Sequence, residues 1–418
     1  MKEQQIHLYH QKEEYIRLKQ RINNDEGLSE SNKQLILNFG KHCITKGITT
    51  HRAHKYTQQL QTIAKKLDQD LDKATRKDIE AFIEWLDTAT YQRFVPKPIQ
   101  TKYQQIPYSE STKSDYRITL KVFYKWLEAT KLGISVKELE MKRKEPDLIT
   151  FFTSRTKKDK QKMPEELITE EEALLLIKNC LNDRDKAFIS TLFESACRIG
   201  EIATLQIKNI VFDEYGCKIL VNGKTGERQI RLIASAPYLK KWLNKHPLSE
   251  ERNAPLWIDF RTKNLPSYNM FRKILQKAAK RSNIKKPVNP HQFRHSAATL
   301  LAGKLTEQQL KAYGGWKPNS DMVSVYVHLS GRDIDDAILE LHGLKKKTQE
   351  DKSKMLPKKC EQCKTINDSV NAYCEKCGAP LTLSAALQTD YNKELSMKTM
   401  EEKMKLLEEK LDNVLMQK

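Results

Sequence analysis

The sequence predicts a mainly α-helical protein with one small antiparallel sheet. Three observations predict this fold class. Apolar residues recur every three or four positions through most of the 418 residues, which is the spacing of amphipathic helices. Short β-prone runs surround Asn222-Gly223, a pair typical of hairpin turns. Two Cys-x-x-Cys pairs near the C-terminus are typical of a small metal-stabilised ribbon.

The composition favours a nucleic acid as the partner. Charged residues make up 31% of the chain and the formal net charge is +20, so an acidic polymer is the first partner to consider. The alternative is a basic soluble protein without such a partner. We find no apolar run near the ~18 residues of a membrane helix and no secretory signal after Met1. We therefore expect a cytoplasmic, nucleoid-associated protein that binds no membrane.

The first part of the chain is expected to be all helical. Residues 1–25 are interpreted as a helical extension and 26–145 as a helical domain of about four helices. The expected helices cover 31–46 and 51–67, begin at Thr75, and cover 111–129. Thr75 and Asp78 have the spacing of a capping box. Pro96, Pro98 and Pro107 indicate a loop.

A basic linker at 146–165 leads into a second domain, expected at 166–345. Its strands are expected around 211–212, 218–221 and 229–233, on either side of a hairpin turn. Its helices are expected at 169–179, 186–198, 237–244, 267–281, 290–302, 306–312 and 322–327.

The chemistry-bearing residues gather in this second domain. His291 and Arg294 share one helix face, and Asn289-Pro290 marks the start of that helix. An imidazole, a guanidinium and unpaired N–H groups at one helix N-terminus suit a phosphate. The alternative is a solvated helix face. Tyr326, between two valines, is interpreted either as a nucleophile or as a core residue.

Two further pieces precede that helix. Arg198 and Glu201 lie three residues apart, so the carboxylate can hold the guanidinium while its fork faces a phosphate. The alternative is a surface ion pair of little energetic value. Lys224 lies at the hairpin turn, either as a solvated tip or as a proton donor that reaches a neighbouring site.

At these residues the chain resembles the tyrosine recombinase family of the phage-integrase type, over about 26–345. The family's separated motifs are matched in order by Arg198, Lys224, His291 with Arg294, Trp316 and Tyr326. The Gly314-Gly315-Trp316 and Tyr326-Val327-His328 forms are similar to members from archaea and their mobile elements. Ala196 stands where glycine is usual, and Gly314 where leucine is usual.

The resemblance implies a site-specific recombinase that forms a 3′-phosphotyrosine and needs neither ATP nor a metal for catalysis. Tyr326 is the expected nucleophile, and Arg198 and Arg294 clamp the phosphate. His291 is the expected base, Lys224 the acid and Trp316 a packing and hydrogen-bonding group. Glu201 and His295 are supporting residues. The resemblance also implies a helical DNA-binding domain and a tetramer on two duplexes. Alternatives are a DNA-binding or chromatin-type protein, and a type IB topoisomerase.

The C-terminal segment is expected to be separate from this chemistry. After a linker at 346–358, residues 359–383 are expected to form a zinc ribbon with four thiolate ligands, Cys360, Cys363, Cys374 and Cys377. Residues 384–418 are expected to form a helix. Its apolar seam consists of Met397, Met400, Met404, Leu407, Leu411 and Val414. Such a seam favours either a short coiled coil or a helix laid back on its own protein.

Overall fold

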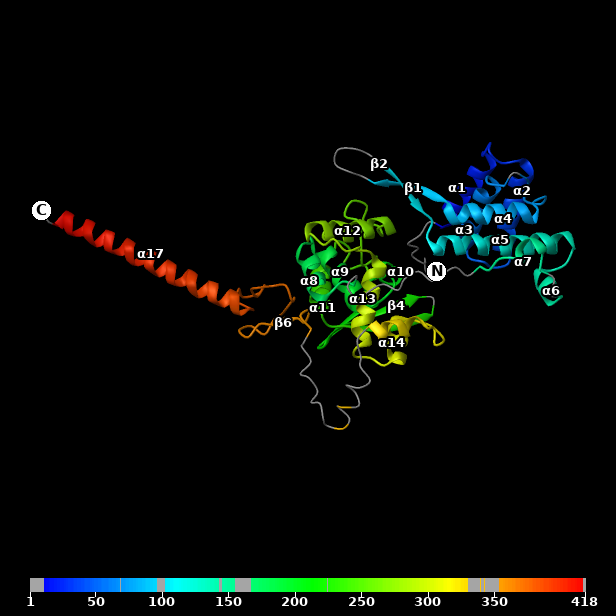
Figure 1. Ribbon diagram of the computed structural model, residues 1–418. Coiled ribbons are helices and arrows are strands. Elements are labelled where there is room, and N and C mark those ends of the chain that lie inside the picture. The colour runs from blue at the N-terminus through cyan, green and yellow to red at the C-terminus, as the bar shows by residue number, and fades with distance from the viewer. Residues whose placement is uncertain are drawn as a thin grey trace. The chain divides into compact units, whose positions relative to one another are not determined.

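The computed structural model describes residues 11–67, 69–95, 102–142, 145–154, 167–223, 225–329, 339, 342 and 353–415 (Figure 1). The chain divides into two compact units, one of residues 10–161 and the other mainly of residues 162–418. Both are mostly helical, which confirms the predicted fold class.

The first unit is built from helices that bury one apolar face each. They are α1 (Gln11–Asn23), α2 (Glu30–Thr45), α3 (Thr50–Ala64), α4 (Arg76–Thr88), α5 (Glu110–Lys131), α6 (Val136–Met141) and α7 (Asp147–Thr150). The predicted capping box of Thr75 and Asp78 is present at the start of α4. Phe39 and Phe123 meet edge to face at 5.4 Å in the centre of the core, an arrangement that aromatic rings favour.

Two expectations for this unit differ from the structure. The expected boundary at residue 26 does not coincide with the fold, because α1 buries Tyr15, Leu18 and Ile22 in the core of the first unit. The expected loop at Pro96, Pro98 and Pro107 differs at Pro107, which lies in β2 (Lys102–Pro107), the partner of β1 (Thr90–Val95), whereas Pro96 and Pro98 lie outside the described residues. Pro107 ends its strand, where a residue without an N–H is tolerated.

The second unit follows the predicted order of elements closely. Its helices are α8 (Glu170–Lys178), α9 (Asp183–Ser195), α10 (Ile199–Ala203), α11 (Ala236–Asn244), α12 (Tyr268–Arg281), α13 (Pro290–Ala302), α14 (Glu307–Gly314) and α15 (Met322–Leu329). Local capping explains the agreement. Thr169 and Asn289 accept N–H groups at the starts of α8 and α13, as serine, threonine and asparagine do at N-caps.

The small sheet has the order β3-β4-β5 and is antiparallel throughout. Its strands are β3 (Ile210–Asp213), β4 (Gly216–Gly223) and β5 (Gly226–Leu232). Asn222 and Gly223 belong to β4 and pair with Glu227 and Gly226, so the hairpin continues two residues beyond the start of the expected Asn222-Gly223 turn.

Helix α9 occupies the centre of this unit and packs against α8, α11 and α13. Near its end, the Glu194 carboxylate accepts N–H groups from Ile233, Ala234 and Ser235 at distances of 2.7–2.9 Å. These bonds tie α9 to the chain that leaves β5. The segment after α9, which carries Arg198, therefore has a fixed position relative to the sheet.

The C-terminal ribbon is anchored to the second unit. Two short strands, β6 (Lys358–Lys359) and β7 (Ile366–Asn367), pair within it. Val370 packs against the core of the unit, and the Ser369 hydroxyl lies 3.2 Å from the Tyr238 hydroxyl of α11. Lys241 of α11 forms an ion pair with Glu375. The ribbon is thus fixed to α11 by both apolar and polar contacts.

The ribbon continues directly into α17 (Leu383–Leu415), a helix of 33 residues. No helix among the described residues combines the length and the apolar character that crossing a membrane requires.

The junction after α9 predicts an unusual stability change. Ala196 has φ +51° and ψ +15°, left-handed values that strain an L-residue. We expect Ala196→Gly to raise the free energy of unfolding by about 0.5–1 kcal/mol, the relief of strain being partly offset by the freer unfolded chain. Scanning calorimetry of the full chain measures this change. Ala187→Gly, inside α9, is the matched control and should lower stability by about 1 kcal/mol or more. A decrease for Ala196→Gly would contradict the strain argument.

Candidate active site

The turn after α9 presents Arg198 at the start of α10. The Arg198 backbone N–H donates to Glu201 Oε2 at 2.9 Å, and its Nη1 donates to Glu201 Oε1 at 3.1 Å. Nη1 also donates to the Gly315 carbonyl at 3.0 Å. The predicted Arg198–Glu201 pair is therefore present. It is not a surface ion pair, because the Glu201 side chain is only 3% exposed.

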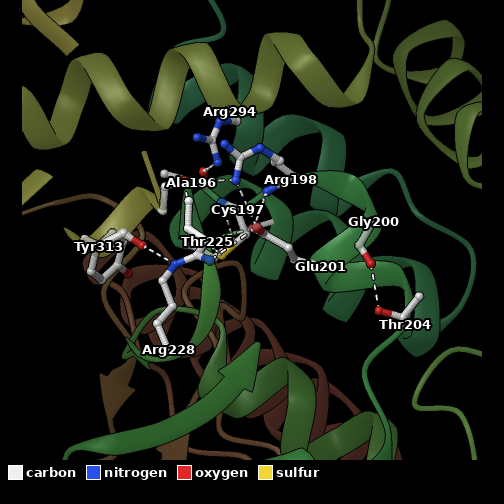
Figure 2. Close-up of polar contacts among 12 residues, drawn as sticks. Ala196, Cys197, Arg198, Gly200, Glu201, Thr204, Thr225, Arg228, Arg294 and Tyr313 are labelled. Atoms are coloured by element: carbon white, nitrogen blue, oxygen red, sulfur yellow. Dashed lines mark hydrogen bonds and ion pairs between the residues drawn. The ribbon is translucent and has the colours of Figure 1, made fainter. Parts of the chain in front are cut away.

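A residue that the sequence analysis did not single out completes this pair. Arg228 on β5 donates from Nη2 to Glu201 Oε2 at 2.8 Å and from Nη1 to Glu201 Oε1 at 3.2 Å. Its Nε donates to the Tyr313 carbonyl at 2.8 Å. Glu201 is thus held between two arginines, and Arg228 links the sheet to the end of α14 (Figure 2).

The electrostatics of Glu201 follow from this arrangement. Burial alone would raise the pKa of its carboxyl group, but hydrogen bonds from Arg228 and the Arg198 backbone outweigh burial and lower the pKa. The carboxylate is therefore ionised at neutral pH and orients both guanidinium groups.

Arg294 of α13 lies next to Arg198 (Figure 2). Its Nη1 donates to the Ala196 carbonyl at 2.9 Å, whereas its buried Nη2 has no hydrogen-bond partner among the described residues. Burial, reinforced by the charge of Arg198, lowers the pKa of Arg294 to about 10, so it stays protonated at neutral pH. A buried N–H group without a partner is costly and is rare in native proteins. An anion bound here would satisfy it.

The Gly314-Gly315-Trp316 segment packs against the arginines of this site. Gly315 ends α14 with φ +66°, and a Cβ on it would lie 2.6 Å from the Arg228 guanidinium. A Cβ on Gly314 would lie 1.7 Å from the Trp316 ring. The absence of side chains lets Trp316 fold back, and the Arg294 guanidinium lies 3.9 Å from the centre of its ring. The close approach of the Trp316 ring to Gly314 explains why a glycine occupies the position where leucine is usual.

Tyr326 on α15 joins the same cluster. Its ring centre is 5.5 Å from that of Trp316, and its hydroxyl lies 2.8 Å from His295 Nδ1. Only 3% of the residue is exposed. Burial raises the pKa of the phenol, and the positive charge of Arg294 partly opposes that shift. A buried tyrosine of this kind needs a proton acceptor before it can act as a nucleophile.

The remaining predicted residues lie at the edge of this cluster or outside the described part. His291 is an exposed residue in the first turn of α13, with its ring centre 6.5 Å from that of His295. Lys224 lies outside the described residues. Its neighbour Thr225 donates to the Gly315 carbonyl at 3.4 Å, the same oxygen that Arg198 contacts.

The four cysteines of the ribbon form a separate candidate metal site. All four sulfur atoms lie within 4.8 Å of one another. Cys360 and Cys377 are 3.6 Å apart, and Cys363 and Cys374 are 3.5 Å apart. A tetrahedral zinc ion with Zn–S bonds of about 2.3 Å separates its ligands by about 3.8 Å. The donor set and its spacing fit such an ion.

The cluster formed by Arg198, Arg294, Trp316, Tyr326 and His295 indicates a class of protein. The guanidinium groups of Arg198 and Arg294 lie side by side, and Arg294 has an unsatisfied donor among the described residues. A buried phenol, paired with an imidazole, contacts the same tryptophan as Arg294. Such an arrangement of groups is chemically suited to the transfer of a phosphoryl group to a tyrosine.

Comparison with known proteins finds similarity to one family. The profile of the phage integrase family matches residues 166–332. A tyrosine recombinase of Thermosipho africanus is 26% identical over 293 residues, covering 68% of this chain and 91% of that protein. The tyrosine recombinase XerC of Corynebacterium glutamicum is 26% identical over 161 residues, which is 51% of its length. Residues 166–332 thus match the phage integrase family, and the chain is similar to tyrosine recombinases, a family whose members cleave and rejoin DNA through a tyrosine intermediate.

Solved structures agree with this assignment at the level of the fold. A lambda integrase tetramer bound to a Holliday junction has a TM-score of 0.53 at 17% identity, covering 76% of this chain and 82% of that one. A lambda integrase dimer bound to a COC′ core site has a TM-score of 0.52 at 17% identity, covering 72% of this chain and 78% of that one.

The hydrogen bonds between Arg228 and the buried Glu201 predict that replacing Arg228 strongly lowers the stability of the protein. We expect Arg228→Leu to lower the free energy of unfolding by about 3–5 kcal/mol, because it removes a partner from a buried carboxylate. Arg228→Lys should lose less, since it keeps the charge but not the two-pronged geometry. Urea titration of each variant measures these changes.

Arg231 provides the matched control on the same strand. It pairs with Asp213, and both side chains are about a third exposed (33% and 31%). Arg231→Leu should therefore cost less than about 1 kcal/mol. Equal effects of the Arg228 and Arg231 substitutions would refute the special role of the buried pair.

Proposed function

We propose that this chain cleaves and rejoins DNA at defined sites, with Tyr326 as the nucleophile of a 3′-phosphotyrosine intermediate. The observation that carries the proposal is the buried Nη2 of Arg294, which has no partner among the described residues and lies beside Arg198. A non-bridging oxygen of the scissile phosphate would accept its hydrogen bond. Charge that develops on that oxygen in the transition state would then be stabilised by both arginines.

The phosphate would be held from two sides. Arg198 and Arg294 contribute guanidinium groups whose positions are set by Glu201 and by the Ala196 carbonyl. His291, at the start of α13, would contact the phosphate from the helix N-terminus, where anions bind favourably. The net charge of +20 supports contacts to further phosphates along a duplex.

We assign the general base to His295 in place of His291. The Tyr326 hydroxyl lies 2.8 Å from His295 Nδ1, within the distance that direct proton transfer requires. In the neutral tautomer protonated at Nε2, Nδ1 accepts the phenolic proton as Tyr326 attacks phosphorus. Trp316, in contact with both Tyr326 and Arg294, would keep water out of the reacting centre.

Lys224 remains the proposed acid on sequence grounds. As the Tyr326 oxygen forms its bond to phosphorus, the bond to the 5′ oxygen of the next nucleotide breaks. Lys224 would supply the proton which that oxygen needs to leave as a hydroxyl. The same groups act in reverse when a 5′-hydroxyl attacks the phosphotyrosine, so the exchange consumes no ATP.

Several properties of the whole protein belong to the same proposal. We infer that double-stranded DNA is the partner, that the helical unit of residues 10–161 provides a second DNA-binding surface, and that four copies act on two duplexes. Association with the nucleoid would follow from the partner. The Gly314-Gly315-Trp316 and Tyr326-Val327-His328 forms favour an origin in an archaeal mobile element.

We further propose that Cys360, Cys363, Cys374 and Cys377 bind one structural zinc ion. A closed set of four thiolates leaves no position for a substrate, so the ion would stabilise the ribbon and take no part in strand cleavage.

Tyr326→Phe should abolish the covalent protein–DNA adduct on a nicked suicide duplex while DNA affinity stays within about twofold of the native value, because only the nucleophilic oxygen is removed. His295→Gln should slow adduct formation about 100-fold or more through loss of the base. Denaturing gel electrophoresis of the adduct measures both.

His291→Gln is the comparison that separates the two histidines. It should weaken phosphate positioning and slow the adduct less than His295→Gln does. A larger loss for His291→Gln would return the base to His291. An adduct that survives Tyr326→Phe would refute the choice of nucleophile, and a native chain that never forms an adduct would favour a DNA-binding protein without strand cleavage.

The role of Lys224 has its own test. A duplex with sulfur in place of the bridging 5′ oxygen expels a thiolate, which leaves without being protonated. Lys224→Ala should therefore slow cleavage of the ordinary duplex about 100-fold or more but restore near-native rates on the sulfur-containing duplex. His295→Gln should not be rescued by sulfur. An equal defect of Lys224→Ala on both duplexes would exclude the lysine as the acid.

Removal of the metal should destabilise the ribbon first. A chelator is expected to unfold residues 358–380 and to lower the melting temperature of the second unit by a few degrees, because Val370 then leaves the shared core. Hydrogen exchange and calorimetry measure the two effects. Strand cleavage should persist at lower temperature. Unchanged exchange in the ribbon after complete metal removal would show that no metal supports its fold.

A further inference from the structure

Helix α17 exposes an apolar surface that nothing in the described part of the chain covers. From Met397 to Leu407 its seam residues are 60–70% exposed, namely Met397, Met400, Met404 and Leu407. A helix of 33 residues is about 50 Å long, and a helix of mixed composition gains most of its stability from packing an apolar face. The seam therefore requires a partner.

The ribbon holds the start of this helix in place. The Thr382 hydroxyl accepts the Ala385 N–H at 3.2 Å, and the Tyr373 hydroxyl donates to the Ala385 carbonyl at 3.4 Å. Ala385 is 5% exposed. Among the described residues, these contacts hold the first turn of α17, and none of them involves the seam.

The spacing of the seam identifies its geometry. Met397, Met400, Met404 and Leu407 are separated by three, four and three residues, which are the a and d positions of a heptad. The positions with the same spacing upstream are Asp390 and Lys393, so the seam begins at Met397. Leu411 and Val414 continue it in the sequence, and their side chains lie outside the described part.

The charges beside the seam favour one orientation. Lys403 occupies a g position, and Glu401 and Glu408 occupy e positions. In a parallel pair of identical helices, each g residue faces the e residue five positions later in the partner, so Lys403 faces the partner's Glu408 twice. In an antiparallel pair, e positions face e positions and g positions face g positions, which opposes like charges.

We propose that α17 is a dimerisation helix that pairs in parallel with the same helix of a second copy of this chain. The methionines at three of the four described seam positions make the contact adaptable and modest in strength. The pairing needs no DNA and does not rest on the proposed strand cleavage. Two catalytic units, each fixed to its α17 through the ribbon, would therefore be joined before either meets a recombination site.

Sedimentation of the metal-loaded full chain without DNA tests the proposal. We expect a concentration-dependent monomer–dimer equilibrium. Met400→Glu combined with Leu407→Glu should raise the dimer Kd by more than about 100-fold, because it places charges in the seam. Both positions are exposed within one chain, so the monomer should fold normally. A chain that stays monomeric at about 100 micromolar, or a dimer unaffected by this variant, would overturn the proposal.

Charge exchange tests the orientation. Lys403→Glu alone and Glu408→Lys alone should each raise the Kd about tenfold, whereas the double exchange should restore it, because opposite charges again face each other. Lys405→Glu makes the same charge change away from the seam and should leave the Kd within about twofold of the native value. Failure of the double exchange to restore dimers would overturn the parallel arrangement.

Discussion

The site depends on a single buried carboxylate. Glu201 accepts hydrogen bonds from Arg198 and Arg228, and it is almost completely shielded from water. A buried carboxylate is tolerated only when positive charges and donors surround it, so the fold must bring α10 and β5 together to form it at all. The position of Arg198 is therefore fixed by the core of the domain and does not depend on a flexible surface side chain.

Two backbone carbonyls extend this constraint to the rest of the site. The Gly315 carbonyl accepts from Arg198 and from Thr225, which adjoins the proposed catalytic lysine, and the Tyr313 carbonyl accepts from Arg228. The end of α14 is consequently tied to both the sheet and α10. Trp316 follows this point and contacts Arg294 and Tyr326, so the same network also positions Tyr326, the proposed nucleophile.

The sequence was most informative where structure is local. Caps such as Thr169 and Asn289 act within three residues, and the helices of the second unit were predicted closely from them.

Contacts between distant parts of the chain were not predicted. Arg228 was missed because its partner, Glu201, is 27 residues away and no periodicity marks such a pair. His295 was assigned only a supporting role because its contact with Tyr326 arises from the packing of α13 on α15. The β1–β2 hairpin was hidden by prolines that usually indicate loops. The role of Lys224 stays a prediction.

The burial of Tyr326 affects how long a phosphotyrosine ester, which conserves the energy of the broken phosphodiester bond, would survive before the strand is rejoined. A phosphotyrosine ester formed at a side chain that is 3% exposed would be sheltered from bulk water. Hydrolysis would release the enzyme and leave a permanent lesion, whereas a sheltered ester would persist until a strand end with a 5′-hydroxyl attacks it. The same packing that makes the phenol difficult to ionise would thus favour ligation over accidental damage to the genome.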